Sequence, residues 1–588
     1  MQTGFATVQV RQWRSCLQLF AGPVPFALRT SCAAIISLLI AMKMELGSPQ
    51  WAPLTVWVVA TASRGETLSK ARWRLLGTIV GCCAGVFLIA AFPQETGLFF
   101  ISLALWMAFC CGFAPFLAGY RSYGFLVAGF TTAIVAVDAI PNPTQAFSIA
   151  IARGTYIELG IICEALLTAL CSAGHSVRAR ETLLHRLHAT QKTVQQAMTA
   201  PFTPERWKTT LADIMATSAQ IEYDALEIGP VSGHTADHAR AIIAELLIAS
   251  ARFLSGTGNA SENMQSIQKH MKEIAEPSYN DHYRFRNRSA RQATDGFRNA
   301  LRIFLGIMLA GLIWVITAWS EGVTFIADTA LVYGLLSTRE IPASASSDFA
   351  KGAFLCAMTA MLYVLLIIPT LNTPEMLALC LIPPMIIGGM AARTKRFLNY
   401  AFSFNMFLPV LISPLNQGRL DEVTFFNGTS AFLAAVIFAS FMFRVIMVFR
   451  PENHLKRTQA WADRKLRELT KSDNHIQLNQ WLFLNADSIV RSVRISQSLS
   501  DRITMDFFER HMRTMILGVC LIEMRNFEEN PEISNYFRQK LRVFFRIWNK
   551  NPEHAVPLLP HLERQILRDM PEHVTIANAA KSIERLYS

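Results

Sequence analysis

The chain has 588 residues, of which 52% are hydrophobic and only 17% are charged, and its mean hydropathy is +0.28. These values exclude an ordinary soluble protein of this length and favour a membrane protein with several spans. The net charge of +12 does not indicate nucleic-acid binding, because most of the basic residues flank apolar runs, where lipid headgroups and membrane topology account for them.

Twelve apolar runs follow one another along the chain, and most reach the roughly 20 residues that a helix needs to cross about 30 Å of hydrocarbon. The first six lie at about 24–44, 50–63, 72–92, 97–117, 122–139 and 148–172. The second six lie at about 297–319, 322–338, 349–369, 375–392, 397–414 and 425–448. The sequence therefore predicts an all-α membrane protein with about twelve spans.

Two long polar regions follow the two sets of runs. The predicted transmembrane parts are 1–172 and 297–448, and the predicted polar regions are 173–296 and 449–588. Both polar regions carry apolar residues at helical spacing, as in the stretches 175–198 and 501–524. We therefore expect a cytoplasmic helical bundle after each transmembrane part.

Short motifs recur about 274 positions apart and relate the two transmembrane parts. Ala-Leu-Arg at 27–29 returns at 300–302, and Ser-Arg-Gly-Glu at 63–66 returns as Ser-Thr-Arg-Glu at 337–340. Internal repeats of several spans are typical of transporters, whose substrate site lies between the repeats. The fold class predicted is thus two six-helix transmembrane repeats, each followed by a cytoplasmic bundle.

The basic residues of the short loops predict the orientation of the spans. Loops on one side of the predicted membrane hold Arg64, Lys70, Arg72, Arg74, Arg121, Arg339, Lys351, Arg393, Lys395 and Arg396. Loops on the other side hold only Lys43 and Arg419. This bias places both termini in the cytoplasm, and we expect a multi-pass protein of the cell inner membrane.

Four segments carry a resemblance to a known family. They are SPQWAPLT at 48–55, RWRLLGTIVGCCAG at 72–85, RSYGFLVAGFTTAIV at 121–135 and RGTYIELGIICEALL at 153–167. They resemble the fusaric acid resistance family, which includes aromatic acid exporters. The resemblance implies secondary active efflux of aromatic carboxylic acids, driven by protons and assisted by a periplasmic membrane-fusion adaptor. In one departure from the family pattern, Tyr156 stands where an acidic residue is expected.

Ionisable side chains inside a span usually face a cavity or a partner, because a lone charge is costly there. Arg153 and Glu164 in the sixth span lie on one helical face, about 16 Å apart along the axis, whereas Glu158 points away from Arg153. We expect Arg153 to bind the anion and Glu158 and Glu164 to carry protons. Structural ion pairs between helices are the alternative.

Three further ionisable residues are predicted to act within the spans. Asp328 in the eighth span would carry a proton, or would cap a helix where the span is broken. Arg29 and Arg302 are equivalent in the repeat and would bind the anion, or would extend to lipid headgroups. Arg64 with Glu66, and Arg339 with Glu340, would form gate pairs or ordinary loop ion pairs.

Aromatic and helix-breaking residues also point to a site. Trp51 and Tyr123 would stack on an aromatic substrate, or would pack in the core. Short or interrupted spans mark transporter sites, and here the second span is short and Pro383-Pro384 interrupts the tenth. Glycines at 77, 81 and 85 predict a face for close helix packing.

No motif indicates an enzyme, a cofactor or a metal. A Walker lysine motif and a GxSxG motif are both absent from the sequence, and the pair His234/His238 has too few neighbouring ligands for zinc. The expected partners are the lipid bilayer, a small organic anion, protons, the adaptor and a second copy, with a homodimer favoured. The alternative functions are a passive organic-anion channel, like a distantly similar plant malate-channel family, and a membrane-anchored sensor or scaffold.

Overall fold

The computed structural model describes residues 24–587 except for short gaps. The gaps are 62–63, 118, 172–175, 229–231, 257–259, 278–282, 284, 286–292, 338, 340, 372, 395, 415–420, 472–475, 497–498 and 532. Every regular element among the described residues is a helix, which confirms the all-α prediction. The chain divides into two compact units: unit 1 takes Met1–Ala173 and Arg291–Phe449, and unit 2 takes Gly174–Ala290 and Arg450–Ser588.

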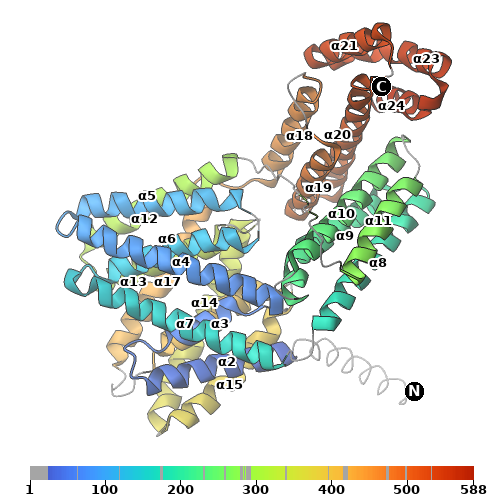
Figure 1. Cartoon of the computed structure of the whole chain (residues 1–588). Coiled ribbons are helices and arrows are strands. Elements are labelled where there is room, and N and C mark those ends of the chain that lie inside the picture. Colours follow the sequence, from blue (N-terminus) through green and yellow to red (C-terminus); the bar gives the residue numbers. More distant parts are fainter. Residues whose placement is uncertain are drawn as a thin grey trace, which may run out of the picture. The chain divides into compact units, whose positions relative to one another are not determined.

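Unit 1 contains twelve apolar helices along its described residues (Figure 1). In the first half they are α2 (Val24–Lys43), α3 (Trp51–Val59), α4 (Arg64–Ala91), α5 (Thr96–Phe113), α6 (Tyr120–Asp138) and α7 (Ala146–Cys171). In the second half they are α12 (Ala293–Thr317), α13 (Gly322–Leu336), α14 (Pro342–Leu362), α15 (Pro374–Ala392), α16 (Leu398–Ile412) and α17 (Glu422–Val445).

Nine of these helices, counted over the described residues, are long and apolar enough to cross a membrane. The other three are α3, α13 and α16, with 9, 15 and 15 residues. At 1.5 Å per residue they extend only about 14–23 Å, less than the roughly 30 Å of hydrocarbon. Ser413, whose φ of 44° is left-handed, ends α16. The protein is therefore a multi-pass membrane protein in which three of the predicted spans are short.

Two details differ from the sequence-based expectation. Helix α4 begins at Arg64 rather than near 72, so several basic residues assigned to a loop lie on its first turns. Apolar runs miss such polar extensions because hydropathy marks only the part of a helix inside the hydrocarbon. The prediction that Pro383-Pro384 interrupts the tenth span is wrong, because α15 continues through both prolines. Neighbouring helices can compensate for hydrogen bonds lost at a proline.

Glycine rows allow the closest helix contacts in unit 1. On α4, Gly77, Gly81 and Gly85 face α6, and a Cβ atom at Gly81 would lie 2.7 Å from Thr131 Cβ and 2.8 Å from Ala128 O. Helix α14 packs on α16 in the same way, with Gly352 against the Tyr400 backbone. Helix α5 also lies beside α12, and α2 beside α15 (Figure 1). Segments from both halves of the chain thus build one membrane unit.

Unit 2 has one hydrophobic core that draws on both polar regions. Its helices are α8 (Ser176–Thr199), α9 (Pro204–Ile228), α10 (Ser232–Ser255), α11 (Ala260–Ala275), α18 (Pro451–Glu468), α19 (Leu478–Ile495), α20 (Asp501–Glu528), α21 (Asn535–Lys550), α22 (Pro552–Ala555), α23 (Leu559–Asp569) and α24 (Val574–Tyr587). Buried Trp207 from the first region shares the core with Trp481 and Trp548 from the second. Arg252 on α10 forms a 2.9 Å ion pair with Glu523 on α20. The two polar regions therefore fold together.

Candidate functional site

The three short helices of unit 1 have a cavity at each of their ends. Residues at the carboxyl ends of α3 and α13, together with the first turns of α16, line a cavity of about 550 Å³. Residues just before α3 and α13, together with the last turns of α16, line a second cavity of about 470 Å³. Both volumes lie in the range of small-molecule sites.

The first cavity, called the basic cavity here, carries a surplus of positive charge. Among the described residues, three cations line it, Lys70, Arg339 and Arg393, against one carboxylate, Glu66. Burial lowers the pKa of Arg339, although the guanidinium retains its charge at neutral pH. Aromatic side chains form much of the remaining wall: Phe26, Trp57, Tyr120, Tyr123 and Phe402. Such a cavity suits an organic anion with an aromatic ring.

Behind the wall of the basic cavity lies the buried guanidinium of Arg74. Its side chain on α4 is fully buried, and Nη1 donates a 3.0 Å hydrogen bond to the Tyr123 hydroxyl. The guanidinium also lies 5.3 Å from the centre of the Phe130 ring. The predicted site residue Tyr123 therefore connects the cavity to a buried cation.

The second cavity, called the acidic cavity, has the opposite charge. The charged residues that line it, within the described part of the chain, are Glu321, Asp328 and Asp421. Asp421 caps α17, accepting hydrogen bonds from Thr424 Oγ1 at 2.8 Å and Val423 N at 3.1 Å. These hydrogen bonds hold the pKa of Asp421 below its ordinary value. Cations and protons are therefore favoured in this cavity, and anions are disfavoured.

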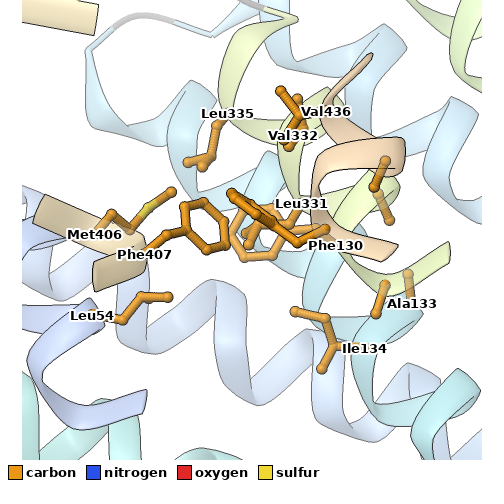
Figure 2. Close-up of a cluster of buried hydrophobic side chains, with 14 of the residues drawn as sticks. Leu54, Phe130, Ala133, Ile134, Leu331, Val332, Leu335, Met406, Phe407 and Val436 are labelled. Atoms are coloured by element: carbon orange, nitrogen blue, oxygen red, sulfur yellow. The ribbon is translucent and has the colours of Figure 1, made fainter. Parts of the chain in front are cut away.

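An apolar cluster lies between the residues that line the two cavities. Figure 2 shows side chains from α3, α6, α13, α16 and α17 gathered around Phe130 and Phe407. Along α13, Leu331 and Val332 lie between Asp328 of the acidic cavity and Leu335 of the basic cavity. In this conformation the cluster is a hydrophobic barrier between the cavities.

Arg153 lies in the interior of unit 1, stacked on an aromatic ring. Its guanidinium carbon is 3.8 Å from the centre of the Trp51 ring, and its side chain is only 4% exposed. None of its three guanidinium nitrogens has a hydrogen-bond partner among the described residues. The structure thus brings together the predicted residues Arg153 and Trp51 and leaves the donors of the arginine available.

Two carboxylates act electrostatically on Arg153. One is Asp328 on α13 and the other is Asp138, an exposed residue at the end of α6. Asp328 is buried, yet no described residue donates a hydrogen bond to it. It does not cap α13, which begins six residues earlier. A buried carboxylate without donors, near a cation and a polar cavity, can exchange a proton.

Arg29 and Glu164 form a buried ion pair. Arg29 Nη2 donates to Glu164 Oε1 at 2.9 Å and to the Thr61 carbonyl at 3.1 Å. Thr168 Oγ1 donates to the same carboxylate oxygen at 3.3 Å, and the Glu164 side chain is fully buried. Glu164 is therefore paired with Arg29 on α2. It does not form an ion pair with Arg153, which lies about three turns earlier on α7.

Arg302 binds the backbone beyond the carboxyl end of α17. Its Nε donates to the Ile446 carbonyl at 3.1 Å and its Nη2 to the Met447 carbonyl at 2.9 Å. Carbonyls at the end of a helix lack partners within the helix, and arginine commonly supplies them. In this conformation Arg302 fixes the end of the last membrane helix and lines neither cavity.

The remaining predicted residues are dispersed. Glu66 and Arg339 both line the basic cavity, and Tyr120 donates a 2.7 Å hydrogen bond to Glu66. Arg64 is exposed and does not line the cavity. Glu158 is exposed on α7 and is not among the buried charges. Glu340 lies outside the described residues.

Sequence reasoning missed several charged residues of the site. Loop charge alone places Lys70 and Arg74 in one loop and Arg393 in another, and nothing in the sequence distinguishes Asp138 at the end of the fifth predicted span. The sequence does contain one signal for the first two: Lys70, Arg74, Thr78 and Cys82 are spaced four apart, and positions four apart share a helix face. It identifies the polar side of α4 once the helix is known to begin at Arg64.

The sequence also matches known proteins. Residues 23–293 and 248–575 match the Fusaric acid resistance protein family. The chain is 30% identical to the uncharacterized transporter GOX0755 of Gluconobacter oxydans, over 86% of this chain and 82% of that protein. No solved structure matches.

Two shorter matches cover about a quarter of each relative. The uncharacterized transporter YdhK of Escherichia coli K12 is 29% identical over 28% of this chain and 25% of its own length. The p-hydroxybenzoic acid efflux pump subunit AaeB of Escherichia coli O1:K1 is 30% identical over 25% of this chain and 24% of its own length. These matches confirm the resemblance seen in the sequence. The chain belongs to the fusaric acid resistance protein family and is a membrane transporter.

Proposed function

We propose that the protein is a secondary active exporter of small aromatic and other organic carboxylates, located in the cell inner membrane. The observation that carries this proposal is the basic cavity: in its described lining, three cations face one carboxylate and aromatic rings form much of the wall. Cations attract the carboxylate and the rings contact the apolar body of the substrate. The name of AaeB, a relative over part of its length, points to the same chemistry.

The orientation follows from the placement of basic residues. With both termini in the cytoplasm, the basic cavity opens toward the cytoplasm and the acidic cavity toward the periplasm. A cytoplasmic anion then enters a cavity that attracts it and leaves through one that repels it. This charge difference favours outward movement.

We further propose that the membrane unit consists of two six-helix repeats with twelve segments. The helix packing supports this arrangement, because pairs in the first half have counterparts in the second. Helix α4 packs on α6 as α14 packs on α16, and α3 packs on α7 as α13 packs on α17. Pairs that join the halves also correspond, since α5 packs on α12 and α15 on α2. Unit 2 would then be the cytoplasmic part.

Coupling to protons would centre on Arg153 and Asp328. When Asp328 is ionised it attracts Arg153; when it takes a proton from the acidic cavity, Arg153 loses that counter-charge and binds the substrate carboxylate. The substrate carboxylate and the ionised Asp328 carboxylate thus compete for one guanidinium, so the protonation state of Asp328 controls substrate binding. Glu164 and Glu158 remain predicted coupling residues, and Arg29 and Arg302 predicted anion-binding residues that would act in other conformations.

The hydrophobic barrier favours alternating access over a passive channel. An open channel needs a continuous polar path, whereas Leu331, Phe130 and Phe407 belong to a buried apolar cluster (Figure 2). A periplasmic membrane-fusion adaptor and a homodimer complete the proposed assembly.

The test is export by the purified full-length protein reconstituted in proteoliposomes. Radiolabelled benzoate should move against its gradient when a proton gradient is imposed, and an uncoupler should abolish that movement. Acetate tests whether an aromatic ring is required. Downhill flux that is insensitive to the uncoupler would identify a channel, and no flux of either acid would refute the proposed function.

A further inference from the structure

The guanidinium of Arg74 is buried, and two of its three nitrogens have no described hydrogen-bond partner. Nη1 bonds to Tyr123, but neither Nε nor Nη2 has a hydrogen-bond partner among the described residues. A buried cation without a counter-ion is costly, since desolvation is offset only by opposite charge and hydrogen bonds. The fold therefore maintains a positive charge at this position that no described carboxylate neutralises by direct contact.

The nearest charged neighbours of Arg74 include two further cations. Lys70, one turn earlier on α4, and Arg153 on α7 both repel Arg74 electrostatically. Glu66 attracts Lys70, but its carboxylate already accepts a hydrogen bond from Tyr120. Arg74 thus has two cationic neighbours, Lys70 in the lining of the basic cavity and Arg153 elsewhere in unit 1, so an anion close to Arg74 would be stabilised.

Tyr123 connects this charge to the cavity. Its ring lines the basic cavity, and its hydroxyl oxygen accepts the hydrogen bond from Arg74. A hydroxyl that accepts one hydrogen bond still has its own proton to donate. Polarisation by the guanidinium strengthens that donor. The Tyr123 hydroxyl is therefore suited to bind an acceptor in the cavity.

We propose that Tyr123, polarised by Arg74, forms a carboxylate-binding site in the basic cavity, which an aromatic acid occupies before it reaches Arg153. The carboxylate accepts the Tyr123 proton, and the ring of the acid lies against the neighbouring aromatic wall, which includes Tyr120 and Trp57. Arg74 is a positioning residue that acts through Tyr123 and through its unneutralised charge. This site rests on the proposed function and adds an entry step to it.

The test is equilibrium binding of radiolabelled benzoate to the full-length protein, with benzyl alcohol as a neutral probe of similar shape. We expect Tyr123→Phe and Arg74→Gln each to weaken benzoate binding about tenfold, the loss of one charge-assisted hydrogen bond. The double variant should lose less affinity than the two single losses combined, because both residues act in part through one hydrogen bond. Affinity for benzyl alcohol should not change.

Arg72→Gln is the matched control, since Arg72 is exposed on the same helix, and it should bind benzoate like the wild type. Wild-type affinity in Tyr123→Phe, or equal loss of benzoate and benzyl alcohol binding, would overturn the site. Tyr123→Phe keeps the ring and its packing, so the test stands even when Arg74→Gln does not fold. Wild-type export in proteoliposomes is measured on the same preparation, so failure of the site is distinguished from failure of the proposed function.

Discussion

The Arg153 guanidinium lies 3.8 Å from the centre of the Trp51 ring while all three of its nitrogens lack a hydrogen-bond partner among the described residues. The planar cation is stabilised by the ring face and keeps its donors for another acceptor. A residue of the sixth predicted span and one of the short second span thus form a preorganised anion site.

Replacing Arg153 by lysine tests this stacked geometry. Lysine keeps the charge but lacks the planar fork that both stacks on the ring and binds a carboxylate through two nitrogens. We expect Arg153→Lys to lower benzoate export at least about tenfold, with unchanged abundance in the membrane. Arg72→Lys, an exposed arginine of α4, is the control. Full export by Arg153→Lys would remove the stacked guanidinium from the mechanism.

Removing the charge of Asp328 should uncouple transport from protons. Asp328→Asn cannot exchange a proton, so uphill export should cease while downhill movement of benzoate continues. Asp421→Asn is the matched control in the same cavity. The depressed pKa of Asp421 keeps this helix cap ionised at neutral pH, so it exchanges no proton there. Glu158→Gln, measured in parallel, tests the second predicted proton carrier. Uphill export by Asp328→Asn would contradict the coupling role.

The buried pair Arg29–Glu164 can be tested by removing one charge and then both. Arg29→Met leaves the fully buried carboxylate unpaired, which should cost about 3–5 kcal/mol and lower the amount of folded protein. Arg29→Met/Glu164→Met should restore abundance because no buried charge remains. Abundance is read by immunoblot and export by benzoate efflux. If the double variant exports benzoate normally, the ion pair has only a structural role. If the double variant is abundant but does not export benzoate, the result supports the predicted transport roles of Arg29 and Glu164.

The contact between α4 and α6 depends on the absence of a side chain at Gly81. Gly81→Ala places a Cβ atom 2.7 Å from Thr131 Cβ, so the helices must separate, at a cost of about 1–3 kcal/mol. We expect a lower melting temperature in detergent. Gly154→Ala is the control, because its added Cβ would meet no atom of another described helix within 4 Å. Equal melting temperatures for the two variants would refute this account of the packing.

Unit 2 should lose stability in acid through His511. Both ring nitrogens of this buried residue lack a hydrogen-bond partner in the described part of unit 2, and burial lowers its pKa from 6.5 to about 3. Between these values the unfolded chain binds a proton that the folded chain does not, so stability falls as the pH drops, by about 1.4 kcal/mol per pH unit. His511→Leu should melt several degrees above the wild type at pH 5 and close to it at pH 8. A gap that does not depend on pH would contradict this assignment.

The sequence was sufficient for the helical class, the family and the position of most spans, because hydropathy and loop charge act locally along the chain. It could not identify the partner of a buried charge. Arg29 and Glu164 are far apart in sequence, and only the fold pairs them. Arg302 likewise looked like an anion-binding residue, yet it binds carbonyls at the end of α17. Arg74 was missed because its helix begins before the apolar run.

The shared core of unit 2 has a consequence for biosynthesis. Helix α10 is translated well before α19 and α20, the helices that cover one of its sides, and the entire second membrane half is translated between them. Until ribosomes reach the final segment, the apolar side of α10 lacks its native cover and is open to chaperones or aggregation. Nascent chains that stop after residue 449 should therefore be degraded quickly, and a separately expressed 450–588 fragment should rescue them.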